Sequence, residues 1–211
     1  TAGDDRMLYV WRLEDLLNEA AEPVPRALGG HNAKVVHLAF SADGRRLASS
    51  SWDHAVGLWS VPAFESEGFL SGHDAPVHAA LFSKDGRALY SAGADGHIRQ
   101  WDVIKGRYVR SLANNGWGIN VLAIDEDRDL LAYGTANGAM RSISLSGAGP
   151  SIDYSEEGPP VLSLALDWKT ARIAFGNSEG RVLIADAGTG GIERDFRAVM
   201  GPVWGMALMP G

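Results

Sequence analysis

Short apolar runs alternate with turn-forming residues along most of this chain. Residues 72–102 show the pattern most clearly, because three apolar runs, APVHAALF, ALYSAG and HIRQW, are separated by the turn sequences SKDGR and ADG. Short runs joined by Asp-Gly turns are typical of antiparallel strands connected by tight hairpins. This stretch therefore predicts three antiparallel strands that follow one another in sequence order.

The same pattern returns with a period of 42 residues. Gly30-His31 returns as Gly72-His73, and the signature fades in later repeats while the apolar positions persist. Two sets of apolar residues keep this spacing: Val35, Val77, Ile119, Val161 and Val203, and Phe40, Phe82, Ile124, Leu166 and Leu208. A fixed period of this size indicates a repeat architecture in which each unit buries its apolar faces against its neighbours.

These repeats resemble the WD-repeat β-propeller family. The resemblance rests on the Gly-His pairs, on SADG at 41–44 and SKDG at 83–86, and on the Gln-Trp-Asp sequence at 100–102. It implies an all-β fold, a β-propeller of the WD-repeat type with four-stranded antiparallel blades. The outer strands are expected in GFL, RYVRSL, PSIDY and IERDF. One fold hosts many functions, so the resemblance says less about function.

We expect residues 1–211 to form a single WD-repeat propeller domain that starts and stops inside a blade. About five blades are represented, with repeats near residues 1–13, 30–60, 72–102, 114–144, 156–186 and 201–211. Part of a seven-bladed propeller is the favoured interpretation, and a closed five-bladed ring is the alternative. In either case residues 203–208 are expected in an innermost-strand position, next to Ile173 or across a gap from the first blade.

An insertion between the first two repeats predicts a short helix. From Trp11 to Trp59 the spacing is 48 residues, and the surplus falls in LEDLLNEAAEPVPR. The leucines of this segment have helical spacing, and Pro23 and Pro25 end the run. We expect the helix to cover the bottom of a blade; a helix that docks a partner is the alternative.

Composition excludes several classes of function. The chain has 211 residues, a net charge of −7 and no cysteine, which disfavours nucleic-acid binding and excludes disulfides and thiolate metal sites. No apolar run reaches the roughly 18 residues of a membrane span, and no signal peptide opens the sequence. We expect no membrane insertion and a soluble protein, with the cytoplasm favoured over the periplasm; the oligomeric state is left open.

In the WD-repeat family a histidine, a serine or threonine, an aspartate and a tryptophan often form one hydrogen-bonded chain within a blade. The resemblance assigns this structural network to His31, Ser49, Asp53 and Trp59 in one repeat, and to His73, Ser91, Asp95 and Trp101 in the next. Its first fragment keeps Thr1, Asp5 and Trp11. A hydrolase triad is the competing interpretation, but buried polar groups must pair, so we favour rigidity over catalysis. The later repeats lack the network and are expected to be held by packing alone.

The family resemblance places partner binding on the face that carries the Gly-His loops and the aspartate turns. The partner-binding candidates are Trp52, Lys34, His54, Asp74, His97 and Trp117. Trp52 is the leading candidate, because a large aromatic residue in a turn exposes apolar surface unless something packs on it. Packing on a neighbouring loop is the alternative for both Trp52 and Trp117.

We therefore expect a non-catalytic scaffold that binds a protein or peptide partner and needs no cofactor. His54 and His97 lie on adjacent turns, but a metal site would need a third ligand, and we expect none. A sensor or accessory propeller domain of a larger bacterial redox protein, such as a c-type cytochrome fusion, is the alternative function. Its haem-attachment motif would have to lie outside these residues, because it needs cysteines.

Overall fold

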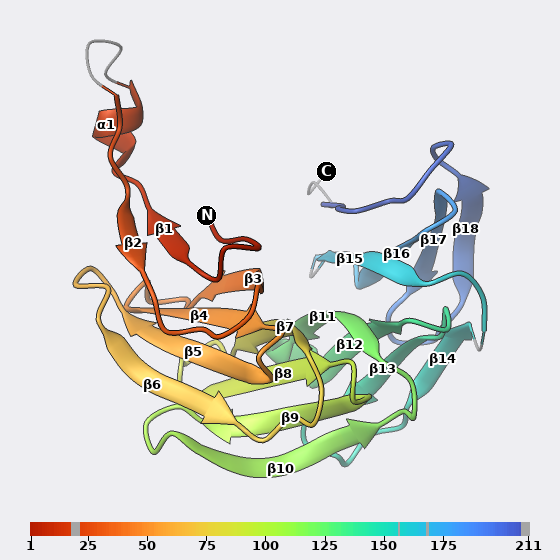
Figure 1. Cartoon of the computed structure of the whole chain (residues 1–211). Coiled ribbons are helices and arrows are strands. Elements are labelled where there is room, and N and C mark those ends of the chain that lie inside the picture. Colours follow the sequence, from red (N-terminus) through yellow and green to blue (C-terminus); the bar gives the residue numbers. More distant parts are fainter. Residues whose placement is uncertain (18–21, 156, 168, 208–211) are drawn as a thin grey trace.

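The computed structural model describes residues 1–17, 22–155, 157–167 and 169–207, and Figure 1 shows them as a series of small sheets arranged around an open arc. Each sheet is a meander in which consecutive strands pair antiparallel. In the described part of the chain, no helix has the length and apolar character that a membrane crossing requires.

Four of the sheets are complete four-stranded blades, which confirms the predicted fold class. Blade 1 contains β3 (Val35–Phe40), β4 (Arg46–Ser51), β5 (Ala55–Ser60) and β6 (Ser66–Ser71). Blade 2 contains β7 (Val77–Phe82), β8 (Ala88–Gly93), β9 (His97–Asp102) and β10 (Arg107–Asn114). Blade 3 contains β11 (Ile119–Asp125), the short 3-10 helix η1 (Glu126–Arg128), β12 (Leu130–Thr135), β13 (Met140–Ser144) and β14 (Ile152–Ser155). Blade 4 contains β15 (Val161–Asp167), β16 (Arg172–Asn177), β17 (Arg181–Asp186) and β18 (Ile192–Arg197).

The apolar core lies between the blades. Residues of the second and third strands pack on the first and second strands of the next blade, so both faces of an inner strand are buried. The cluster between blades 1 and 2 includes Val56, Leu58, Val77 and Trp101. Matching clusters join blade 2 to blade 3 and blade 3 to blade 4. Val77, Ile119 and Val161, three residues that share the 42-residue spacing, are buried in these interfaces.

Hydrogen bonds reinforce the same interfaces around the central axis. Each innermost strand has a β-bulge near its start, where the register to the second strand shifts. At two of these bulges a side chain reaches the next blade: His78 Nδ1 lies 3.0 Å from the carbonyl oxygen of Ile119, and Asn120 Nδ2 donates to the carbonyl of Val161 at 2.9 Å. Each bond ties one blade to its successor.

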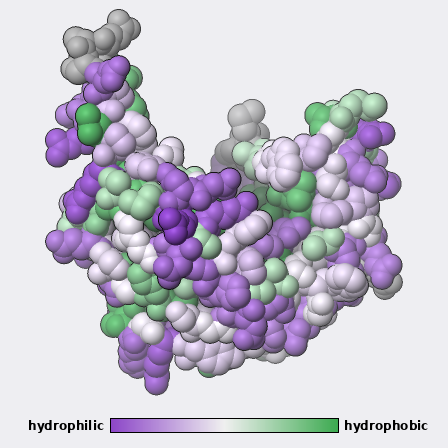
Figure 2. All heavy atoms as spheres, viewed as in Figure 1, coloured by the Kyte–Doolittle hydropathy of each residue, from purple (hydrophilic) through white to green (hydrophobic). Residues whose placement is uncertain are grey.

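An N-terminal ribbon of two strands, β1 (Leu8–Val10) and β2 (Arg26–Leu28), packs on blade 1. Between them α1 (Leu13–Leu17) projects away from the blades (Figure 1). None of its residues is buried, so the expectation that this helix covers a blade is wrong. Figure 2 shows apolar side chains on this projection. Leu13, Leu16 and Leu17 of α1 are exposed. The rest of the insertion includes residues 18–21, which lie outside the described residues.

The C-terminal segment runs beside blade 4 without forming a strand. The backbone N–H of Val203 donates to the carbonyl of Asn177 at 3.0 Å, and Ser163 Oγ donates to the carbonyl of Val203 at 2.8 Å. This segment therefore takes the place next to blade 4 that an innermost strand would occupy; Leu208 lies outside the described residues. Within the described residues no backbone hydrogen bond joins this segment to the N-terminal ribbon.

Candidate functional site

Backbone hydrogen bonds bring two sets of turn residues together at one end of every blade. In each blade the residue before the turn that joins the second and third strands donates its N–H to the carbonyl of the residue that enters the first strand. The pairs are Trp52 with Lys34 at 3.0 Å, Ala94 with Pro76 at 2.8 Å, Ala136 with Gly118 at 2.8 Å and Ser178 with Pro160 at 2.9 Å. We call this end of the blades the Gly-His face.

Trp52 and Lys34 form the most distinctive feature of the Gly-His face. Lys34 Nζ lies 3.7 Å from the centroid of the Trp52 ring, which is the geometry of a cation–π contact. The same nitrogen lies 3.7 Å from Asp4 Oδ1, a highly exposed carboxylate. Trp52 remains 45% exposed, so the lysine covers only part of its surface.

The structure places the other four binding candidates on the same face, in different environments. His54 is exposed and has a left-handed backbone, with φ 71°. Asp74 Oδ2 lies 3.5 Å from Arg99 Nη2, and His97 Nδ1 lies 3.3 Å from Ser111 Oγ. Trp117 is 57% exposed. Among the interactions of the described residues, Lys34 is the only binding candidate that contacts the Trp52 side chain.

Blade 1 contains a continuous hydrogen-bonded chain beneath this face. Trp59 Nε1 donates to Ser49 Oγ at 2.9 Å, Ser49 Oγ lies 2.7 Å from His31 Nε2, and His31 Nδ1 lies 2.8 Å from Asp53 Oδ2. The carboxylate can only accept, so His31 Nδ1–H donates to Asp53, Nε2 accepts from the Ser49 hydroxyl, and that hydroxyl accepts from the indole. Ser49 is fully buried, so no substrate can reach its oxygen and the chain holds the blade together rather than forming a nucleophile.

Blade 2 repeats this chain with Trp101, Ser91, His73 and Asp95, and adds an arginine. Arg99 Nη1 donates to Asp95 and also lies 2.8 Å from His73 Nδ1. Burial, reinforced by the charge of Arg99 and opposed by Asp95, lowers the pKa of His73 to about 4. Burial alone would raise the pKa of Asp95, but the neighbouring His73, backbone N–H groups and Arg99 lower it to about 2.

The arginine has no counterpart in blade 1. The equivalent position is Gly57, where a Cβ atom would lie 2.7 Å from Ser49 Oγ and 3.0 Å from His31 Nε2. Blade 2 accommodates a side chain there, and Arg99 is 8% exposed. Nothing in the repeat signature marks this position, so sequence reasoning did not include Arg99 in the network.

Blades 3 and 4 stabilise the same turn in another way. In blade 4 Asn177 Oδ1 accepts from the N–H of Glu179 at 3.0 Å and from the N–H of Arg181 at 2.9 Å. In blade 3 Thr135 Oγ1 donates to Asn137 Oδ1 at 2.6 Å. The expectation that these blades are held by packing alone is therefore wrong. Asn177 and Thr135 lie two positions before the aspartate position of the family motif, so the motif did not reveal them.

The histidines of the Gly-His face do not gather around one point. Across the described ranges of the chain, no group of three or more His, Cys, Asp or Glu side chains is arranged to hold a metal ion. His97 is engaged with Ser111, and His54 stands on the turn of the preceding blade.

Comparisons with known proteins agree with this architecture. The sequence model of the family described as "WD domain, G-beta repeat" matches residues 23–60 and 64–102, which contain β2, the four strands of blade 1 and the first three strands of blade 2. "Ribosome assembly protein 4" of Chaetomium thermophilum is 43% identical over 61 residues, or 29% of this chain and 11% of that protein. "Cross-pathway control WD-repeat protein 2" of Flammulina velutipes is 39% identical over 61 residues, or 29% of this chain and 19% of that protein.

A third relative matches over a similar stretch. "Ribosome assembly protein 4" of Saccharomyces cerevisiae is 37% identical over 59 residues, or 28% of this chain and 10% of that protein. The similarity thus spans less than a fifth of the length of each relative. The family match falls on the two blades that carry the complete hydrogen-bonded chains, and blades 3 and 4 continue the same fold. Residues 23–60 and 64–102 therefore match WD repeats, and the four blades have the architecture of a β-propeller.

Proposed function

We propose that this protein is a non-catalytic scaffold that binds a protein or peptide partner through the Gly-His face, with Trp52 as the anchor. Its blades hold the loops of this face at fixed separations, so a partner meets a preorganised surface. The names of its relatives refer to ribosome assembly and cross-pathway control, and these names lend no support to the redox alternative.

The observation that carries the proposal is the half-exposed Trp52 with Lys34 over its ring. The contact orients the indole on a turn while leaving nearly half of its surface open to a partner. Asp4 and Asp74 are exposed carboxylates of the same face. An aromatic plate on a face with acidic groups suits a peptide with a cationic or amide-bearing side chain.

The test uses short linear peptides displayed on phage and selected on the immobilised full chain. Binding peptides are synthesised, and their affinities are measured by fluorescence polarisation for the wild type and for Trp52→Ala. We expect Trp52→Ala to weaken binding by about thirtyfold, as for an interface anchor, and to change the free energy of unfolding by less than about 1 kcal/mol. Trp204→Ala is the matched control, because Trp204 is an exposed tryptophan of the C-terminal segment.

A different outcome would identify Trp52 as a packing residue. In that case Trp52→Ala would lower the melting temperature and leave the peptide affinities unchanged. Loss of affinity in Trp204→Ala to the same extent would show that exposed tryptophans bind the peptides without specificity.

A further inference from the structure

The interface between blades 2 and 3 differs from the others at one cross-strand pair. At this level of the second and third strands, the other blades pair a small residue with an apolar or small one: Ala48 with Leu58, Ala132 with Ser142, and Ala174 with Ile184. In blade 2 the pair is Tyr90 with Gln100. In blade 2 a phenol and a carboxamide therefore occupy these two positions, whereas the other blades have shorter or apolar side chains there.

The orientation of Gln100 follows from its contact with Arg110. Arg110 Nε donates to Gln100 Oε1 at 2.8 Å, and Arg110 Nη2 donates to the carbonyl of Leu145 in blade 3 at 2.5 Å. A guanidinium has no acceptor, so the amide oxygen of Gln100 must face it and the amide nitrogen must point elsewhere. Within the described residues, Gln100 Nε2 has no hydrogen-bond partner.

Tyr90 supplies a second donor beside it. Its ring is buried among Ile119, Leu131 and other residues of the interface with blade 3, and its hydroxyl has no hydrogen-bond partner in the described part of the chain. Burial, together with the charge of Glu126, raises the pKa of Tyr90, so the hydroxyl keeps its proton at neutral pH. Both groups are donors that a ligand can use.

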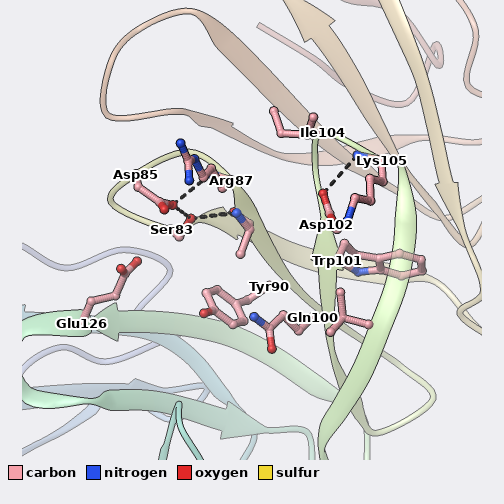
Figure 3. Close-up of a pocket in the computed structure, with 12 residues that line it drawn as sticks. Ser83, Asp85, Arg87, Tyr90, Gln100, Trp101, Asp102, Ile104, Lys105 and Glu126 are labelled. Carbon is pink, nitrogen blue, oxygen red and sulfur yellow. Dashed lines mark hydrogen bonds and ion pairs between the residues drawn. The ribbon is translucent and has the colours of Figure 1, made fainter.

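The two side chains line an open cavity of about 760 Å³ (Figure 3). Figure 3 shows Tyr90 and Gln100 next to each other, with Asp85 and Arg87 on the turn above them and Glu126 to the left of Tyr90. The cavity lies at the ends of the blades that carry the β7–β8 and β9–β10 turns, away from the turn of Trp52. Its volume falls in the range of ligand-binding pockets.

The charges at the rim of the cavity nearly balance. Three carboxylates and two cationic side chains line the cavity. The carboxylates already accept hydrogen bonds: Asp85 from Ser83 Oγ at 2.7 Å, Asp102 from the N–H of Lys105 at 3.0 Å, and Glu126 from the N–H of Lys84 at 2.6 Å. An acidic ligand would meet the excess negative charge, and a basic ligand would compete with these existing bonds.

The apolar part of the lining is exposed to solvent. Ile104 is 64% exposed and Val109 is 49% exposed, and both border the cavity. Two large aliphatic side chains beside two unused donors form a surface that can bury an apolar side chain and satisfy carbonyl groups at the same time.

We infer that this cavity is a second peptide-binding site, which takes an extended, uncharged segment of a partner. Tyr90 and Gln100 donate hydrogen bonds to backbone carbonyls of the segment, and Ile104 and Val109 contact an apolar side chain. A peptide fits because it carries a carbonyl acceptor at every residue, so that one segment can accept hydrogen bonds from both donors. The site lies apart from the Gly-His face, so a scaffold could hold two partners, or two segments of one partner.

The test uses the same phage-displayed peptides and two variants that preserve the fold. Tyr90→Phe removes only the hydroxyl and keeps the ring in the interface, and Gln100→Leu places the residue that blade 1 carries at the equivalent position, Leu58. Melting temperatures measured alongside verify that both variants remain folded. Trp52→Ala is the control for the Gly-His face.

We expect a class of uncharged peptides with one apolar residue that lose affinity roughly fivefold in each variant, the effect of one hydrogen bond. The same peptides should bind Trp52→Ala as they bind the wild type. If every selected peptide depends on Trp52 and none on Tyr90 or Gln100, the second site is wrong and the proposed function stands. If peptides depend on Tyr90 and Gln100 alone, the second site stands and the anchor role of Trp52 is wrong. A selection that yields no binding peptide contradicts both.

Discussion

Removal of the aspartate from each complete network should destabilise blade 2 more than blade 1. Asp53 accepts hydrogen bonds from His31 Nδ1 and from the N–H groups of Asn32 and Ala55. Asp95 accepts the equivalent bonds in blade 2 and also pairs with the guanidinium of Arg99. The arginine is thus the difference between two otherwise matched sites.

The expected magnitudes follow from what each substitution leaves unpaired. Asp53→Ala leaves buried neutral donors without a partner, which costs about 1–3 kcal/mol. Asp95→Ala leaves, in addition, an arginine that is 8% exposed and whose remaining carboxylate partner, Asp74, is an exposed side chain 3.5 Å away. A buried charge with so weak a partner raises the loss to about 3–5 kcal/mol. Removal of Arg99 together with Asp95 should abolish the difference between the two blades, so Asp95→Ala/Arg99→Ala should resemble Asp53→Ala. Glu179→Ala should change stability by less than about 0.5 kcal/mol, because Glu179 is an exposed residue of a turn that Asn177 holds.

Urea unfolding at neutral pH, followed by tryptophan fluorescence and circular dichroism, measures these free energies. Equal losses for Asp53→Ala and Asp95→Ala would refute the role given to the buried arginine. A double variant less stable than Asp95→Ala would refute it as well, since Arg99 would then stabilise the blade without its carboxylate.

Two further predictions concern pH and backbone conformation. The pKa of His73 is lowered from 6.5 to about 4, so the unfolded chain binds a proton that the folded chain refuses, and stability should fall by about 3 kcal/mol between pH 6.5 and pH 4. An undiminished fall in His73→Gln, measured by urea unfolding across this range, would contradict that origin. Gly180→Ala should lower the melting temperature strongly, because Gly180 has φ +86° and its Cβ would lie 2.0 Å from the carbonyl oxygen of Val199. Gly44→Ala, at φ +68° in open space, should lower it only by the conformational effect of about 1 kcal/mol, and equal shifts in thermal unfolding would contradict the clash.

The strands and blades could be predicted because the same sequence pattern occurs in several repeats. Apolar positions at a 42-residue spacing, with Asp-Gly turns between them, specify antiparallel meanders independently of any single residue. The helix of the insertion was predicted from the helical spacing of its leucines, and α1 (Leu13–Leu17) forms. Its contacts could not be predicted, because helical spacing shows that a segment has an apolar side but not which surface that side meets.

The side chains that differ between blades were harder to predict. Arg99 occupies the position of Gly57, and only the three-dimensional arrangement shows that it reaches Asp95. Tyr90 sits in a ladder of core positions, so the sequence suggests packing, and the cross-strand pair with Gln100 emerges only from the strand register. A repeat pattern reveals the residues that the repeats share. Arg99, Tyr90 and Gln100 are not shared by all four blades, so the pattern does not indicate their contacts.

The hydrogen bonds around the central axis give the arc a polarity. At each such bond a side chain of one blade donates to a carbonyl of the blade that follows, as His78 does to Ile119 and Asn120 to Val161. One side of a blade therefore supplies the donor side chain and the opposite side supplies the acceptor carbonyl, so two copies of the same side do not match. A twofold-symmetric pairing of two copies through these sides would set like against like, whereas a head-to-tail contact would repeat the bonding pattern. Lateral association of this molecule, where it occurs, is accordingly expected to be heterologous, with one copy placed after the next in the same rotational sense.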